Sequence, residues 1–328
     1  MNIVLVIPTG IGAEIGGHAG DGNGVAKLLA SVADNLITHP NVLNASDINE
    51  MPNNTLYVEG SMLDRFLRGE INLKKAKGNR ILLAVNKVNN DIINATSAAR
   101  ATIGANIRII ELNTPLLMKA CMKNGKATGD ISGWDDLVEQ VNEYYDEFDA
   151  LAIASPIEVN KEAAENYLIN GGVNPWGGIE AKGSKRIADA LDKPVAHAPF
   201  GNTLENFDQV VDPRMAAETV SVAYIHCVFK GLHKAPRVSY NSNDLSVKDV
   251  DCLITPINCV GEPHWACIKE GIPIIAVKEN KTVLNDVMPD SFIVVDNYLE
   301  AVGMVQLLKL GMTVESVRRP LPFTTIIK

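Results

Sequence analysis

Short runs of β-branched residues alternate with amphipathic stretches along the whole chain, and this alternation limits the possible fold more than any other feature. The predicted strands are residues 3–7, 55–58, 81–85, 108–112, 150–154, 194–197, 252–255, 273–277 and 292–295. Between them lie helical patterns, such as the apolar face Val25, Leu28, Leu29, Val32 and Leu36. Strands that alternate with helices of about ten to fifteen residues imply βαβ units. The sequence therefore predicts an α/β protein with mainly parallel, doubly wound sheets in two Rossmann-like domains.

The length of 328 residues is about twice that of a typical domain, which favours two domains. A polar, glycine-containing stretch at residues 123–133 is the predicted boundary. It divides the chain into an N-terminal α/β domain, residues 1–130, and a C-terminal α/β domain, residues 131–328. Residues 234–249 form a possible sub-boundary.

The net charge of −9 argues against a protein that grips nucleic acid or an anionic membrane through a broad basic surface. No segment approaches the roughly 18 apolar residues of a membrane span. The five cysteines are an odd number without paired spacing, which is typical of reduced thiols. These features predict a cytoplasmic protein without nucleic-acid or membrane partners, and they leave a homo-oligomer possible.

Polar residues follow most of the predicted strands. Ligands of parallel sheets bind beyond the carboxyl ends of the strands, so these residues are the candidates for a site. They are Thr9, Glu59, Asn86, Lys87, Asn113, Thr114, Ser155, His197, Asn258, Cys259, Lys278, Glu279 and Asp296. Loop starts are polar in any case, and many such residues cap helices.

Seven glycines occupy fifteen positions after the first strand, where average usage would place about one. Such a loop lets backbone N–H groups approach an anion, and the helix that follows adds partial positive charge. Its spacing fits neither the Walker loop nor the dinucleotide fingerprint. The predicted substrate-binding residues here are Thr9, Gly10, Gly12, Gly16, Gly17, His18 and Asp21. The alternative is a flexible lid or a tightly packed turn.

Cys259 lies between a predicted strand and a helix that starts near Pro263, with His264 close by. A thiol near a helix N-terminus can have a lowered pKa and act as a nucleophile or base. The commoner fate of a cysteine is burial as a small apolar side chain. The spacing of Cys259, His264 and Cys267 matches none of the usual zinc patterns, so no metal site is predicted.

His197 ends a predicted strand, where a histidine can act as an acid or base near neutral pH or can be purely structural. Glu59 offers a carboxylate at another strand end. The amides of Asn86, Asn202 and Asn258 are predicted to stabilise developing negative charge. The stretch 174–180 is either a substrate wall that includes Trp176 or the entry to a helix that ends near Leu191.

The chain resembles the bacterial and plastid-lineage family catalogued as domain of unknown function 3326. Four segments carry the resemblance: PTGIGA at 8–13, GGHAGD at 16–21, LITHPNVLN at 36–44 and YVEG at 57–60. The resemblance covers the whole chain and implies no mechanism. In the order of its strands and helices the chain is also similar to the aspartate/glutamate racemases. Those enzymes place one cysteine on a strand-end loop of each domain, whereas this chain has Asn86 where the first would stand and Cys259 where the second would.

The function predicted from the sequence is an enzyme that acts on a small anionic metabolite by proton abstraction next to a carboxylate, of the isomerase or lyase type. Cys259, His197 and Glu59 are its predicted catalytic residues. The alternatives are a nucleotide- or sugar-phosphate-binding transferase and a non-catalytic metabolite sensor. The sequence identifies no cofactor.

Overall fold

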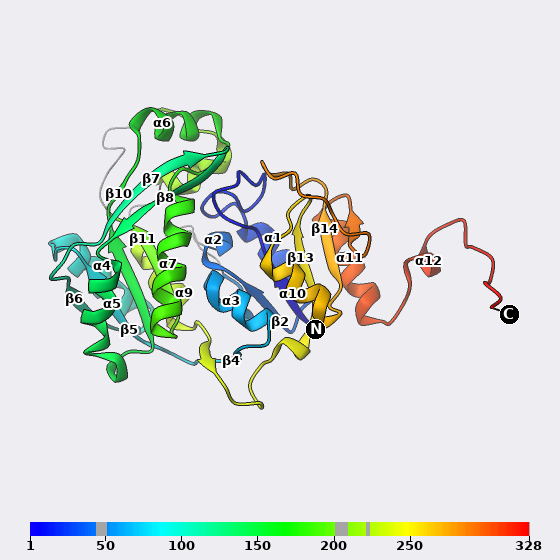
Figure 1. Ribbon diagram of the computed structural model, residues 1–328, viewed down its shortest axis with the longest axis horizontal. Coiled ribbons are helices and arrows are strands. Elements are labelled where there is room, and N and C mark those ends of the chain that lie inside the picture. Colours follow the sequence, from blue (N-terminus) through cyan, green and yellow to red (C-terminus); the bar gives the residue numbers. More distant parts are fainter. Residues whose placement is uncertain (44–50, 201–208, 221–223, 328) are drawn as a thin grey trace.

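The computed structural model describes residues 1–43, 51–200, 209–220 and 224–327 of the chain. Within these residues the protein forms two α/β lobes that stand side by side, each built on a parallel sheet (Figure 1). The predicted α/β class with mainly parallel sheets is confirmed.

The first lobe is built on a six-stranded parallel sheet that takes strands from both ends of the chain. In spatial order the strands are β15 (Ile293–Val295), β14 (Ile274–Val277), β13 (Val250–Pro256), β1 (Asn2–Leu5), β2 (Asn35–Thr38) and β3 (Thr55–Tyr57). Its helices are α1 (Asn23–Ala30), α2 (Pro40–Leu43), α3 (Gly60–Leu67), α10 (Glu262–Glu270) and α11 (Tyr298–Lys309). Ile3 and Leu5 enter one buried cluster and Val4 enters another. Both faces of the central strand are therefore covered, as a doubly wound sheet requires.

The second lobe is built on a four-stranded parallel sheet from the middle of the chain. In spatial order its strands are β11 (Val195–Pro199), β9 (Ala150–Ser155), β5 (Arg80–Val85) and β6 (Asn106–Glu111). A small second sheet contains β10 (Ile157–Glu158), β7 (Leu117–Lys123) and β8 (Lys126–Ser132). The helices of this lobe are α4 (Asn90–Ile103), α5 (Trp134–Asn142), α6 (Lys161–Asn170), α7 (Gly177–Leu191), α8 (Ala216–Val220) and α9 (Tyr224–His233). Short 3-10 turns of the chain are η2 (Tyr145–Glu147), η3 (Pro213–Met215) and η4 (Val247–Asp249).

The chain crosses between the lobes twice, and the two crossings pair with each other. β4 (Asn72–Lys74) follows α3, and β12 (Arg237–Ser239) follows α9; they form a two-stranded antiparallel ribbon. The return crossing lies within residues 234–249, the possible sub-boundary. The predicted domain boundary, between residues 130 and 131, does not coincide with the division between the lobes. It lies inside β8, and strands from both sides of it belong to the four-stranded sheet.

A continuous apolar core joins the lobes. The buried cluster that contains Ile3 and Leu29 of the first lobe also contains Leu83 of β5 and Phe229 of α9. Tyr57, at the end of β3, packs so closely on Gly231 of α9 that a Cβ there would lie 2.5 Å from the ring. The lobes therefore share one apolar core, to which α9 contributes.

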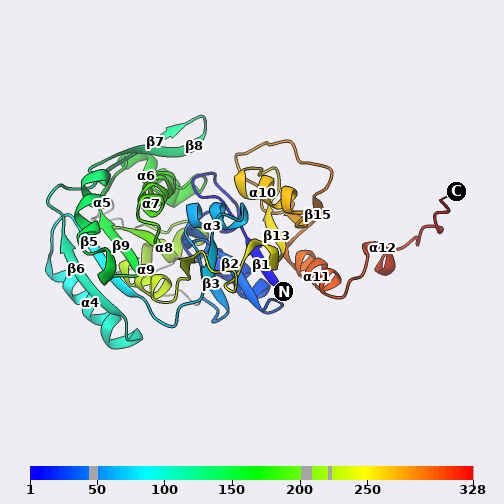
Figure 2. The same ribbon diagram turned by 60° about the horizontal axis from the view of Figure 1, so that its bottom comes forward.

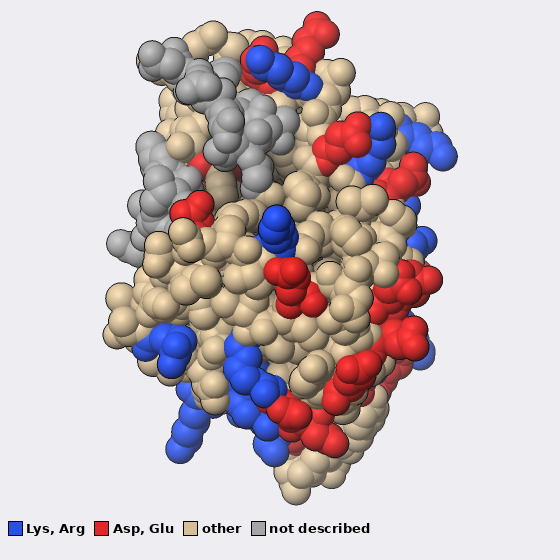
Figure 3. Space-filling model, turned by 90° about the vertical axis from the view of Figure 1, so that its left-hand side faces the viewer, with Lys and Arg blue, Asp and Glu red and all other residues tan. Residues whose placement is uncertain are grey.

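Figure 2 shows that the segment after α11, which includes α12 (Val314–Val317), leads away from both lobes. On the face in Figure 3, Lys and Arg occur in small groups among Asp and Glu. This mixture fits a chain whose net charge is −9.

Candidate functional site

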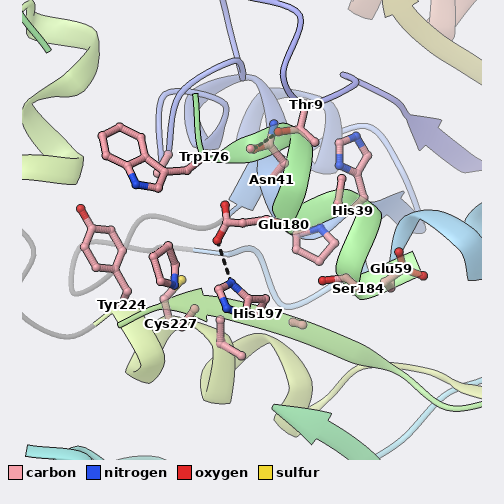
Figure 4. Close-up of a pocket in the computed structure, with 18 of the residues that line it drawn as sticks. Thr9, His39, Asn41, Glu59, Trp176, Glu180, Ser184, His197, Tyr224 and Cys227 are labelled. Atoms are coloured by element: carbon pink, nitrogen blue, oxygen red, sulfur yellow. Dashed lines mark hydrogen bonds and ion pairs between the residues drawn. The ribbon is translucent and has the colours of Figure 1, made fainter. Parts of the chain in front are cut away.

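A cavity of about 1030 Å³ lies between the lobes, at the carboxyl ends of strands from both sheets. The first lobe contributes the residues after β1, β2 and β3, and the second lobe contributes the end of β11 (Figure 4). One face of α7, with Glu180, Ser184 and Lys185, forms a wall between them. This is the position at which parallel α/β sheets bind ligands, so we take the cavity as the candidate site.

His197 is held between two partners at the floor of this cavity. Its Nδ1 lies 3.0 Å from Oε1 of Glu180, and its Nε2 lies 2.9 Å from Oγ of Ser155. Ser155 ends β9, the strand that pairs with β11 in parallel, so the sheet itself fixes the approach of the hydroxyl to the ring. Ser155 and His197 are buried, whereas the Glu180 side chain remains 25% exposed. The imidazole therefore connects a buried hydroxyl to a carboxylate at the cavity wall.

Glu180 is oriented from two directions. It lies in the first turn of α7, where the helix dipole favours a negative charge, and its carboxylate points toward His197 (Figure 4). Asn174 caps the start of this helix, because its Oδ1 accepts from the backbone N–H groups of Trp176 and Gly177 at 2.9 and 3.2 Å. Trp176 lines the cavity. The stretch 174–180 therefore provides both the wall and the helix entry that the sequence left as alternatives.

Glu59 lines the cavity but is also the N-cap of α3. Its Oε2 accepts from the backbone N–H of Ser61 at 2.8 Å and from that of Met62 at 3.3 Å. Burial raises the pKa of this carboxyl to about 7, although the Ser61 hydroxyl and these N–H groups oppose the shift. One carboxylate oxygen is therefore committed to the helix, and Glu59 supports the wall more than it faces a ligand.

The glycine cluster forms a tightly packed joint between the lobes. The backbone N–H of Ala127 in β8 donates to O of Gly10 at 2.9 Å. A Cβ on Gly10 would lie 3.1 Å from Gly178 of α7, and one on Gly17 would lie 2.2 Å from O of Ala13. The glycines are needed because backbones approach closely here. Of the loop residues predicted to bind substrate, Thr9 lines the cavity, whereas Gly10, Gly12, Gly16, Gly17, His18 and Asp21 do not.

One backbone N–H of this loop bonds to a carboxyl group of the protein itself. The N–H of Ala19 donates to Oε1 of Glu218 at 2.9 Å, and Asn174 Nδ2 donates to the same oxygen at 3.0 Å. Ala19 and Glu218 both line the cavity. Burial raises the pKa of Glu218 to about 7, with a smaller contribution from the negative charge of Glu180. Binding of an external anion by the loop stays a prediction.

Within the loop, His18 and Asp21 contact other parts of the protein and do not line the cavity. The ring Nδ1 of His18 lies 2.8 Å from the hydroxyl of Tyr167, and burial lowers the pKa of His18 to about 4. Oδ1 of Asp21 accepts from the backbone N–H of His18 at 3.2 Å, while Oδ2 is buried without a partner within the described part of the chain. Burial raises the pKa of Asp21 to about 7.

Asp21→Asn is therefore expected to change the pH dependence of stability. The folded protein holds a proton on Asp21 up to about pH 7, so the stability linked to that proton is present at low pH and is lost as the pH rises from the ordinary pKa of 3.8 through 7. An amide cannot ionise, so the variant should gain on the order of 2 kcal/mol relative to wild type between about pH 5 and 8. Guanidinium unfolding at these two pH values measures the difference, and a constant difference would contradict a raised pKa.

The structure places Cys259, the predicted catalytic thiol, away from the cavity. The thiol is only 2% exposed, it does not line the cavity, and burial raises its pKa to about 12. His264 is not its base, because Nδ1 of His264 accepts from the N–H of Gly261 at 3.0 Å and Nε2 lies 2.8 Å from the hydroxyl of Thr255. The strand-end thiol of the racemase comparison is thus absent from the cavity.

Alkylation should distinguish the buried thiol of Cys259 from the exposed thiol of Cys121. Iodoacetamide at pH 8 is expected to label the exposed Cys121 and to leave Cys259 unmodified until the protein is unfolded. Cys259→Ala should lower the free energy of unfolding by about 1 kcal/mol and leave turnover unchanged. Peptide mass spectrometry reads the labelling, and rapid modification of native Cys259 would restore it as a candidate nucleophile.

The three predicted asparagines also lie apart from the cavity wall or outside the described residues. Nδ2 and Oδ1 of Asn86 bond to the backbone O and N–H of Leu116 at 2.9 and 2.8 Å, which holds a loop. Asn258 has a left-handed φ of 53° and serves a turn after β13. Asn202 lies in the range 201–208, which the structure does not describe. Cavity residues that the sequence did not select include Glu218, Lys185 and His39, and Glu180 was considered only as part of the stretch 174–180.

Within the described ranges, no group of three or more His, Cys, Asp or Glu side chains is arranged to hold a metal ion. The described helices also include none that is both long and apolar enough to cross a membrane.

Comparison with known proteins identifies the family. The family described as "Protein of unknown function (DUF3326)" matches residues 2–318. A curated protein from Synechococcus sp., described as an uncharacterised lipoprotein, is 34% identical over 332 residues, which cover 94% of this chain and 91% of that protein. No solved structure matches the chain. The chain therefore belongs to the DUF3326 family.

Proposed function

We propose that the protein is an enzyme that transfers a proton on a small anionic metabolite bound between the lobes, with Glu180 as the acid or base. The observation that supports it is the contact of the Glu180 carboxylate with His197, whose other nitrogen contacts the buried Ser155 hydroxyl. The reaction class we favour is proton abstraction next to a carboxylate, as in an isomerase or lyase. Glu180 takes the role that the sequence had given to Cys259.

The arrangement suits a base for a physical reason. A carboxylate held by a hydrogen bond from a fixed imidazole loses little freedom when it takes a proton, so less reorganisation accompanies the reaction. If His197 donates from Nδ1 to Glu180, its Nε2 is free to accept from the Ser155 hydroxyl. The buried serine then fixes the ring rather than acting as a nucleophile, because it does not line the cavity.

Exchange of carbon-bound protons tests the proposal across a whole class of candidate substrates. The protein is incubated in D2O with small 2-hydroxy, 2-amino and 2-keto acids. Proton NMR follows the loss of the signal from the hydrogen next to the carboxylate or, in the 2-keto acids, from the hydrogens next to the keto group. We expect protein-dependent exchange in at least one compound. The absence of exchange across the series would contradict the proposal.

A second candidate, a metabolite-binding protein without catalysis, is favoured by the two crossings between the lobes. The β4–β12 ribbon is short, with three paired positions, and the lobes also share one apolar core, so the cavity can narrow around a ligand by a small sliding of packed elements. The Synechococcus relative is described as a lipoprotein, which also fits a binding role. The cytoplasmic location stays a prediction. Ligand-dependent compaction in small-angle scattering without any chemical change would favour this second candidate.

A further inference from the structure

His39 faces the same cavity from the first lobe, and a backbone contact fixes the position of its proton. The ring follows β2, and the N–H of Ile7 donates to its Nε2 at 3.0 Å in a buried position. Nε2 must therefore be an acceptor. In a neutral imidazole the proton then lies on Nδ1.

The surroundings keep this ring neutral. Burial lowers the pKa of His39 to about 4, and the positive charge of Lys185 contributes in the same direction. A second proton would also have to sit on Nε2, against the N–H of Ile7. His39 is therefore an N–H donor at Nδ1 throughout the physiological pH range.

The Nδ1 donor has no partner within the described part of the chain, and the ring lines the cavity. Its polar neighbours on this wall are already occupied. Thr9 donates to Oδ1 of Asn41 at 3.1 Å, and Nδ2 of Asn41 donates to O of Gly16 at 3.0 Å. In Figure 4, Thr9, Asn41 and His39 lie in the upper part of the view, with Glu180 and His197 below them.

Lys185 supplies a second donor near the ring. Its ammonium group has three N–H donors, and one of them bonds to Oδ2 of Asp64 at 2.6 Å. The Lys185 stem passes Gly60 at the start of α3, and the side chain lines the cavity with Glu180 on the same helix. Lys185 and His39 therefore line the same cavity, and the charge of Lys185 acts on the His39 ring.

We propose that His39 is a catalytic hydrogen-bond donor that, with Lys185, binds the carboxylate or carbonyl oxygen of the substrate while Glu180 acts on the neighbouring carbon. This inference rests on the proposed function and adds the groups that bind the substrate oxygen to the base, Glu180, that acts on the carbon. The substrate class is a small acid with a hydrogen on the carbon next to its carboxylate or keto group.

The step balances within the bound molecule. Glu180 removes a proton from the C–H bond, the electron pair of that bond forms a C=C bond, and the π electrons of the C=O bond move onto oxygen. His39 N–H and Lys185 stabilise the negative oxygen so formed. Return of the proton from Glu180 to the same carbon restores the carbonyl without any other reactant, and in D2O the returned proton is replaced by a deuteron.

Nitrogen-15 NMR of the histidine side chains tests the donor directly, with oxalate as the probe because it is planar and resembles an enolate. His39→Gln assigns the signals. We expect His39 to show the neutral form with the proton on Nδ1 from pH 5 to 8, and oxalate to shift that proton downfield. A proton on Nε2, a titration near the ordinary pKa of 6.5, or no response to oxalate would overturn the proposal.

Two substitutions of His39 separate the roles of its two ring nitrogens. Gln can still accept from the Ile7 N–H through its oxygen but cannot offer the Nδ1 donor, whereas Asn places an N–H near the position of Nδ1 and loses the acceptor. We expect His39→Gln to lower proton exchange by about 100-fold at unchanged thermal stability, and His39→Asn to recover part of the rate with a lower Tm.

The outcomes distinguish this inference from the proposed function. If exchange depends on Glu180 but His39→Gln exchanges as fast as wild type, the donor role is wrong and the proposed function stands. If no compound exchanges, the proposed function is wrong, and the oxalate experiment then decides whether His39 binds an anion.

Discussion

Glu180→Gln is expected to slow proton exchange by about 100-fold to 10,000-fold, the range of a positioned general acid or base. Glutamine has the size of glutamate and can still accept from Nδ1 of His197, 3.0 Å away, so the ring should keep its position. It cannot take up a proton. The loss should therefore appear in the rate of exchange and leave the thermal stability within about 1 kcal/mol of wild type.

The matched control is Glu139→Gln, the same substitution at an exposed position of α5 that does not line the cavity. It should exchange at the wild-type rate. Proton NMR in D2O measures both variants on the same compound. Wild-type exchange by Glu180→Gln would show that the base lies elsewhere.

Gly17→Val should destabilise the fold by about 3 kcal/mol or more, because a side chain there has no space. Its Cβ would lie 2.2 Å from O of Ala13 and 2.8 Å from N of Ala13, and both are backbone atoms that cannot rotate away. The loop that contains it also bonds to Glu218 of the second lobe through Ala19. We therefore expect the substitution to weaken the contact between the lobes as well as the loop.

Gly24→Ala is the control for this prediction. Gly24 lies in α1 with no atom within 4 Å of its Cβ position, and alanine in a helix is favoured over glycine by about 1 kcal/mol. The control should be as stable as wild type or more so. Guanidinium unfolding compares the two, and a wild-type midpoint for Gly17→Val would mean that the loop is looser than this packing requires.

The periodic parts of the fold could be predicted from the sequence, and the exceptions have local causes. The apolar pattern from Val25 to Leu36 continues past the end of α1 at Ala30, and Leu36 belongs to β2 instead. A strand of four residues so soon after a helix carries too few positions to break the helical period. Because β2 was not predicted, no strand end pointed to His39.

The predicted domain boundary was a β-hairpin. Asn124 and Gly125 both have positive φ, 52° and 73°, in the turn between β7 and β8. An Asn-Gly pair between two extended runs is a strong hairpin signal, and it would have identified this stretch. The composition of residues 123–133 resembles a linker because tight turns and linkers use the same residues.

The candidate site was predictable where it depends on strand ends and unpredictable where it depends on packing between lobes. Glu59 and Thr9 line the cavity because each follows a strand, and His197 lines it from within β11, near the carboxyl end of that strand. Glu180 lies inside a helix and reaches the cavity only because α7 stands between the lobes. Cys259 also follows a strand, but its side chain is buried away from the cavity, and sequence spacing carries no information on that direction.

A double-mutant cycle on Glu180 and His197 tests most directly whether this pair is the working centre of the protein. Exchange rates of wild type, Glu180→Gln, His197→Asn and the double variant are measured on one compound. Residues that act as a unit are strongly non-additive. We predict that each single variant loses about 100-fold or more and that the double variant is no slower than Glu180→Gln alone. Single variants that keep the wild-type rate, or a double variant whose loss is the product of the two single losses, would contradict the assignment.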